Sequence, residues 1–152
     1  MNIAIAADHA GFPLKELLKK FLEGEGHKVV DYGAKILNME DDYPDFIAPA
    51  ASAVSKGEVE RAILLGGSGQ GEAIVANRFP NVRAIVFYGG KKEIIALGRE
   101  HNDSNALSLA ARFLSFDEAR DAVTAWLSAN FSGDLRHVRR IKKIEEEGAI
   151  YA

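Results

Sequence analysis

The chain of 152 residues contains no cysteine, which excludes disulfide bonds, thiolate metal sites and cysteine nucleophiles. No apolar run approaches the ~20 residues of a membrane span. The net charge is only −3 and no long basic run occurs, so no general attraction to nucleic acid is expected. The N-terminus lacks the basic-then-apolar pattern of a secretory signal, because acidic Asp8 comes too early. We therefore expect a cytoplasmic protein without membrane or nucleic-acid partners.

What is present fits an ordinary globular protein. Apolar residues make up 47% of the chain and charged residues 27%. This length favours a single domain over residues 1–152 with a real hydrophobic core.

Apolar periodicity predicts alternating strands and helices. Strands are expected at 2–7, 27–32, 59–65, 83–87 and 106–110, and helices at 13–23, 43–57, 72–77, 91–100, 116–129 and 135–147. This alternation indicates an α/β fold, a parallel sheet with helices on both faces. In the commonest five-stranded order, 2-1-3-4-5, strand order reverses between strands one and three, where ligands bind. That arrangement brings Asp8 and His9 beside the stretch from Gly66 to Glu72.

The stretch from Gly66 to Glu72 is the most informative part of the sequence. It follows the apolar run 62–65 and contains four glycines and one serine, Ser68. Glycines allow a sharp turn and close approach of a ligand, and a helix start behind them favours negative charge. The helix dipole is expected to keep Glu72 ionised. The P-loop, dinucleotide and hydrolase-elbow motifs all fail here. The alternative is a tight turn without chemistry.

Other polar residues leave two readings open. Asp8 either caps the following helix or belongs to a site, and residues 101–105 are either a simple polar turn or a source of His101 for proton transfer. Arg136 and Arg140 share a helix face, which is either a solvated basic surface or a phosphate clamp that Arg112 joins. The four scattered histidines do not make a metal-ligand pattern.

Several spaced motifs stand out together: Asp8-His9-Ala10-Gly11-Phe12 with Leu14-Lys15, Asp42-Tyr43-Pro44, Gly67-Ser68-Gly69-Gln70-Gly71, Ala76-Asn77-Arg78, His101-Asn102-Asp103-Ser104-Asn105, Arg112, and Arg136-His137 with Arg140. In this order they resemble one known family, the ribose-5-phosphate isomerase B family of sugar-phosphate isomerases. The resemblance implies a Rossmann-like three-layer α/β/α sandwich with a five-stranded parallel sheet. It also implies a homodimer, or a homotetramer, whose active sites are built from two subunits, with helix 135–147 packing on the partner. No metal and no cofactor are implied.

The activity implied is aldose–ketose isomerisation of ribose 5-phosphate to ribulose 5-phosphate in the pentose phosphate pathway. The resemblance suggests His101 for ring opening with Asp8 beside it. The catalytic anion hole would comprise Ser68 and the backbone N–H groups of Gly67, Gly69, Gln70 and Gly71, with a contact from Asn102. Tyr43 would line the sugar pocket, and the phosphate would be bound by His9, Arg112, Arg136, His137 and Arg140.

The base is where the family divides. One branch uses a cysteine just before the glycine loop, a position held here by Gly66. Another branch uses a glutamate after the loop, and Gly71-Glu72 matches it. The resemblance therefore predicts Glu72 as the base.

Three alternatives remain from the sequence. The first is an isomerase of a six-carbon sugar phosphate, such as allose 6-phosphate or galactose 6-phosphate. The second is a flavodoxin-like module that binds a phosphate or nucleotide without turnover. Its phospho-acceptor form expects acidic neighbours for Mg²⁺, but Ala6 and Ala7 precede Asp8. The third, a structural subunit, conflicts with the presence of Asp8, Glu72 and His101 together.

Overall fold

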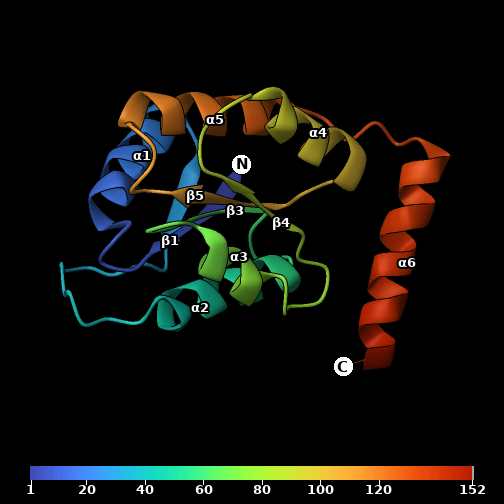
Figure 1. Cartoon of the computed structure of the whole chain (residues 1–152), viewed down its shortest axis with the longest axis horizontal. Coiled ribbons are helices and arrows are strands. Elements are labelled where there is room, and N and C mark those ends of the chain that lie inside the picture. Colours follow the sequence, from blue (N-terminus) through green and yellow to red (C-terminus); the bar gives the residue numbers. More distant parts are fainter. Residues whose placement is uncertain (152) are drawn as a thin grey trace.

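The computed structural model describes residues 1–151 and shows a parallel sheet between two helical layers (Figure 1). The elements in chain order are β1 (Asn2–Ala7), α1 (Phe12–Gly24), β2 (Lys28–Asp31), α2 (Tyr43–Ser55), β3 (Arg61–Gly66), α3 (Gln70–Ala76), β4 (Ala84–Phe87), α4 (Glu93–Asn102), β5 (Ala106–Ala110), α5 (Phe116–Ser128) and α6 (Leu135–Tyr151). All four strand pairings are parallel. The five-stranded α/β fold predicted from the sequence is confirmed.

Alternate residues of the central strands supply two separate cores. Ile3 and Ile5 of β1 pack under α1, α4 and α5, whereas Ala4 and Ala6 face α2 and α3. Side chains alternate between the faces of a strand, so one strand serves both layers. The small alanines of β1 meet an alanine-rich α2, which lets that helix lie close to the sheet.

The strand order is β2-β1-β3-β5-β4, so the predicted order 2-1-3-4-5 was wrong at one edge. All five residues of β5 are buried, and three of the four residues of β4 are only partly buried. The fully buried strand therefore takes the position beside β3, and β4 takes the edge. The reversal between β1 and β3 is unaffected, and Ala7 pairs with Leu65 there.

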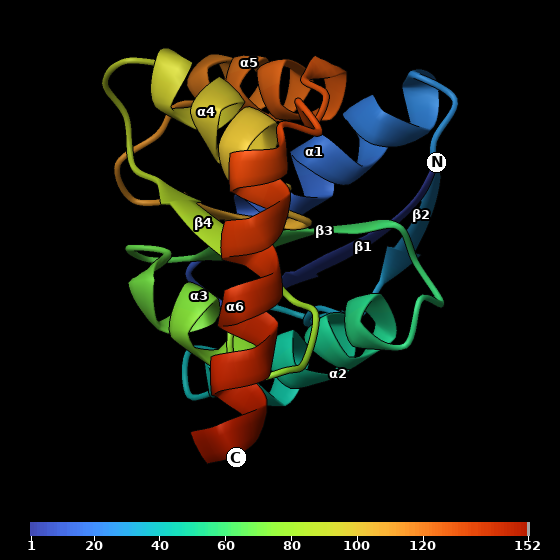
Figure 2. The same cartoon turned by 90° about the vertical axis from the view of Figure 1, so that its right-hand side faces the viewer.

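The last helix, α6, stands at one end of the molecule instead of covering a face of the sheet (Figure 1). In the perpendicular view it crosses in front of β4, from the level of α4 to that of α3 (Figure 2). Glu145 fixes it to the body by accepting hydrogen bonds from Arg83 Nη1 (3.2 Å) and the Asn81 backbone N–H (3.1 Å). Nearer its start, the His137 ring stacks on His101.

No helix among residues 1–151 combines the length and apolar character needed to cross a membrane.

Candidate active site

The loop after β3 is built so that other groups can approach its backbone closely. Gly69 has a left-handed conformation with φ of 74°, which glycine adopts without strain. A Cβ on Gly71 would lie 2.7 Å from the Tyr43 ring, and one on Gly67 would lie 3.3 Å from the Arg112 guanidinium. The glycines therefore serve contacts as well as the turn, which argues against a turn without chemistry.

A buried serine that the sequence reading missed supports this loop. Ser108, in the middle of β5, donates from its hydroxyl to the carbonyl of Gly69 at 2.6 Å. Within the described residues, the backbone N–H groups of Gly67, Ser68 and Gly69 donate no hydrogen bond to another protein group. A polar residue in an otherwise apolar buried strand was the available signal. The loop thus presents free donors on a fixed backbone.

Glu72 lies in the first turn of α3 with only 4% of its surface exposed. Its carboxylate occupies the space that a side chain on Gly66 would need: a Cβ there would fall 1.7 Å from Oε1. The helix starts at Gln70, two residues before the predicted start. Gly66 and Glu72 are therefore adjacent in space, and the absence of a side chain at one makes room for the other.

Burial of Glu72 acts against the helix N-terminus, which was expected to favour the ionised form. Burial raises the pKa of Glu72 above its ordinary value of 4.5, its own backbone N–H opposes the shift, and the charge of Asp8 adds to it. Desolvation of the carboxylate outweighs this backbone N–H because the side chain is almost fully covered. A glutamate with a raised pKa is better matched to proton transfer near neutral pH.

Asp8 directly follows β1 and is 6% exposed. Its Oδ1 accepts the backbone N–H groups of Ala10 (3.0 Å) and Gly11 (3.2 Å), so it shapes the turn before α1. A Cβ on Gly11 would lie 2.7 Å from the carbonyl oxygen of Leu65, which shows how closely this turn presses on the end of β3. Topology thus brings Asp8 next to the glycine loop, as predicted.

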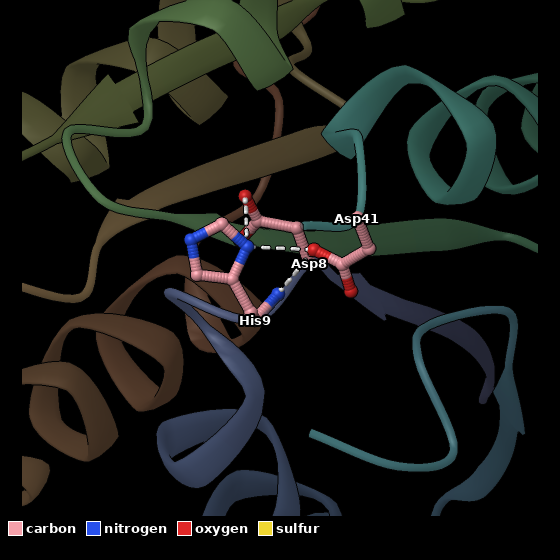
Figure 3. Close-up of side chains that lie close together, drawn as sticks. All are labelled: Asp8, His9 and Asp41. Atoms are coloured by element: carbon pink, nitrogen blue, oxygen red, sulfur yellow. Dashed lines mark hydrogen bonds and ion pairs between the residues drawn. The ribbon is translucent and has the colours of Figure 1, made fainter. Parts of the chain in front are cut away.

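His9 is held by Asp41, a residue that the sequence reading did not select. Asp41 Oδ1 lies 2.7 Å from His9 Nδ1 and accepts the His9 backbone N–H at 3.0 Å (Figure 3). Asp41 comes from the irregular segment between β2 and α2, where sequence gives no periodicity to indicate which acid faces inward. Asp8, His9 and Asp41 each offer one atom within 4.8 Å of the others, a spacing that fits a metal ion. The His9–Asp41 contact itself has hydrogen-bond length.

These groups surround a pocket of about 510 Å³. Its lining residues are Asp8, His9, Ala10, Tyr43, Gly67, Ser68, Gly71, Glu72, Arg112 and Phe113. The pocket therefore collects eight of the predicted site residues at the carboxyl ends of β1, β3 and β5. Gly69 and Gln70 belong to the same loop but do not line it.

The remaining predicted residues lie elsewhere in the chain. His101 and Asn102 are the last residues of α4, not part of a turn as predicted, and they precede β5. They therefore lie near its amino end, whereas Arg112 follows its carboxyl end, and a five-residue strand spans roughly 16 Å. Within one chain His101 is not beside Asp8.

His101 instead contacts α6. Its ring lies 4.4 Å from that of His137, with an interplanar angle of 11°. His137 is 4% exposed and its Nε2 has no hydrogen-bond partner among the described residues. Burial, followed by the nearby His101 and Arg136, lowers the pKa of His137. Arg136 and Arg140 are exposed on the same helix. Within one chain, the predicted site residues thus fall into two separated sets.

Comparison with known proteins identifies the family of the chain. A family model described as Ribose/Galactose Isomerase matches residues 3–144. Ribose-5-phosphate isomerase B of Escherichia coli (strain K12) is 37% identical over 143 residues, which cover 94% of this chain and 93% of that protein. The protein of the same name from Mycobacterium tuberculosis (strain ATCC 25618 / H37Rv) is 36% identical over 96% of this chain and 89% of its own length.

Solved structures agree with the sequence matches. Ribose-5-phosphate isomerase B of Clostridium thermocellum superposes with a TM-score of 0.94 at 41% identity over 100% of both chains. That of Mycoplasma genitalium, solved with bound ribulose-5-phosphate, gives a TM-score of 0.92 at 37% identity, covering 97% of this chain and 96% of that one. This chain belongs to the ribose/galactose isomerase family.

Proposed function

We propose that the protein is a ribose-5-phosphate isomerase that interconverts ribose 5-phosphate and ribulose 5-phosphate through an enediolate. The observation that carries this proposal is the pocket in which a buried carboxylate, Glu72, adjoins unpaired backbone donors and the cationic Arg112. Family membership and the relatives named ribose-5-phosphate isomerase B support the same reaction. With this substrate, we place the enzyme in the cytoplasm and in the pentose phosphate pathway.

The chemistry assigns Glu72 the role of base. Its carboxylate takes the proton from C2 of the open-chain aldose, and the C–H electrons form the C1–C2 double bond as the C1 carbonyl becomes an enediolate oxygen. Backbone N–H groups of the loop from Gly67, with Ser68, stabilise this oxygen where charge develops. The proton of the C2 hydroxyl then passes to the C1 oxygen, the C2 carbonyl forms, and return of the abstracted proton to C1 completes the ketose. No step needs a redox or metal cofactor.

The phosphate and the sugar take the remaining pocket residues. Arg112 and His9 offer donors for the phosphate, and Tyr43, packed on Gly71, forms a wall of the sugar site. Asp8 beside the ring oxygen assists opening together with a histidine. The Gly69 backbone N–H is a further donor for the anion hole, whereas that of Gln70, the first residue of α3, donates to Ser68 Oγ at 3.4 Å.

The missing histidine is supplied, on this proposal, by a second copy of the chain in a homodimer, with a homotetramer as the alternative. α4 and α6 expose large apolar side chains, namely Ile94, Leu97, Leu135, Val138 and Ile144. This surface borders a hollow of about 200 Å³ that reaches His101 and Asn102. A partner seated on it would bring His101 and Asn102 to the other subunit's Asp8, and Arg136 and Arg140 to its phosphate.

His137 stays a predicted phosphate ligand, although its ring is covered by His101 in the single chain. The packing of residues 135–147 on the partner stays a prediction with the same support.

The test of the reaction is turnover of ribose 5-phosphate in EDTA, with allose 6-phosphate and galactose 6-phosphate assayed alongside. We expect pentose turnover at or above ~1 s⁻¹, the lower end of ordinary enzymes. Glu72→Gln should lower kcat by roughly 10²–10⁴-fold. Turnover of a hexose phosphate alone would assign a six-carbon substrate to the same reaction. Loss of activity in EDTA would indicate that the cluster of Asp8, His9 and Asp41 binds a metal ion. Binding of phosphate without turnover of any of these sugars would refute the assignment as an isomerase.

The test of the shared site uses co-expressed variants. Glu72→Gln and His101→Asn should each be inactive alone, because every site then carries one defect. In a mixed dimer with shared sites, one site carries both defects and the other is intact. A random mixture should therefore regain roughly a quarter of wild-type activity. A mixture no more active than its parents would show that each site is made by one chain.

A further inference from the structure

We propose that Asp41 is a positioning residue for phosphate binding: its carboxylate fixes the imidazole of His9 so that Nε2 faces the pocket. The inference rests on the proposed sugar-phosphate site. Asp41 does not line the pocket, whereas His9 does, so Asp41 acts through the histidine.

The geometry of the contact fixes both the ring and its backbone. A single oxygen, Asp41 Oδ1, receives the His9 backbone N–H at 3.0 Å and lies 2.7 Å from Nδ1. Asp8 Oδ2 is 3.9 Å from the same nitrogen, beyond hydrogen-bond length. An ionised carboxylate only accepts hydrogen bonds, so Nδ1 carries a proton. Figure 3 shows the second ring nitrogen on the side away from Asp41.

Because Asp41 is buried, its carboxylate needs a positively charged partner. Its side chain is 8% exposed, and Oδ2 is buried without a hydrogen-bond partner among the described residues. Among the described residues, His9 is the single group that forms an ion pair with Asp41. A buried carboxylate is costly unless a positive group accompanies it. Asp41 is therefore poorly explained as a solvated loop acid, and its placement depends on His9.

The consequence for binding follows from the two ring nitrogens. When the ring is doubly protonated, Nδ1–H donates to Asp41 and Nε2–H donates into the pocket, toward a phosphate oxygen near Arg112. Fixing the ring in advance spares the cost of ordering it when the ligand binds. In this state the positive charge of the ring offsets that of Asp41, which does not line the pocket itself.

The kinetic experiment compares Asp41→Ala, Asp41→Asn, His9→Ala and the double variant Asp41→Ala/His9→Ala. Loss of a hydrogen bond to a charged group should raise KM for ribose 5-phosphate and Ki for inorganic phosphate together, by about tenfold. kcat should change less than about threefold, because the phosphate is held equally in ground and transition states. Asp41→Asn keeps an acceptor without the charge and should show a smaller rise in KM. Glu40→Gln, an exposed acid in the same segment, is the control for charge and should leave KM unchanged.

The double variant decides between positioning and mere support of the loop. If Asp41 acts through His9, removing it in the His9→Ala background should raise KM no further. Independent, multiplicative effects of the two substitutions would overturn the proposal. So would a fall in kcat with KM unchanged.

Nitrogen-15 NMR of the His9 ring separates this inference from the isomerase assignment. The wild-type ring should carry its proton on Nδ1, and Asp41→Ala should shift that signal and weaken the response of the ring to added inorganic phosphate. These shifts in a protein that fails to isomerise ribose 5-phosphate would refute the proposed function and leave the positioning role intact. A ring without a proton on Nδ1, in an active enzyme, would refute the positioning role alone.

Discussion

A single methyl group at Gly66 should disable the enzyme. In Gly66→Ala the new Cβ would lie 1.7 Å from Glu72 Oε1, 2.1 Å from Cδ and 2.6 Å from Oε2. Ordinary contacts require 3.4–4 Å, so the carboxylate has to retreat by about 2 Å. A misplacement of about 1 Å at a reacting centre can cost 10²-fold in rate. We therefore expect kcat for ribose 5-phosphate to fall at least about 10²-fold, toward the value of Glu72→Gln.

The backbone itself should tolerate this change, because Gly66 is not among the glycines with positive φ. Gly24→Ala is the matched control: a Cβ there meets nothing within 4 Å, and activity should be kept. Combining Gly66→Ala with Glu72→Ala relieves the clash, so the double variant should be no less active than Glu72→Ala alone. Full activity of Gly66→Ala at wild-type stability would refute both the geometry and the role of Glu72 as base.

Three further predictions concern titration and stability. Because burial raises the pKa of Glu72, kcat/KM should rise with pH through a midpoint above 4.5. The same shift means that folding stability is lost as pH rises from 4.5 through the folded-state pKa of Glu72. Calorimetry should therefore show that Glu72→Gln raises Tm at pH 7 but not at pH 4. Lys15→Met should lower stability by about 3 kcal/mol, because Lys15 Nζ is fully buried and donates to Asp31 Oδ2 at 2.8 Å; an unchanged midpoint in urea would contradict this. Ser108→Ala removes the shorter of two hydrogen bonds to the buried Gly69 carbonyl, which keeps the Ala73 backbone N–H at 3.3 Å, so stability should fall by about 1 kcal/mol and kcat with it. A loss of stability alone would show that the loop keeps its shape without the serine.

The sequence was sufficient wherever a local pattern determines structure. The buried strand β5 was placed at 106–110 as observed, and the reversal between β1 and β3 correctly joined Asp8 to the glycine loop. Both conclusions need only hydrophobic periodicity and the rule that ligands bind where strand order reverses.

The failures share a physical cause, since each depended on packing between segments distant in sequence. Strand order at the β4 edge is decided by which strand becomes fully covered. The irregular segment before α2 shows no periodicity, so Asp41 could not be distinguished from its acidic neighbours. The upward shift of the Glu72 pKa was not foreseen, because desolvation depends on how completely the neighbours cover the side chain.

The relation between Gly66 and Glu72 shows how such packing links two sequence positions. A side chain at 66 and the carboxylate of Glu72 would occupy the same volume, as the 1.7 Å approach requires. A chain of this fold can therefore place a reactive side chain at the end of β3, or direct one to the same space from the first turn of α3, but it cannot do both at once. Here the glycine is the condition that allows the glutamate to reach the pocket. Gly66→Cys combined with Glu72→Ala would return a side chain to the end of β3, and recovery of activity above that of Glu72→Ala would show that the volume, not the residue, defines the position of the base.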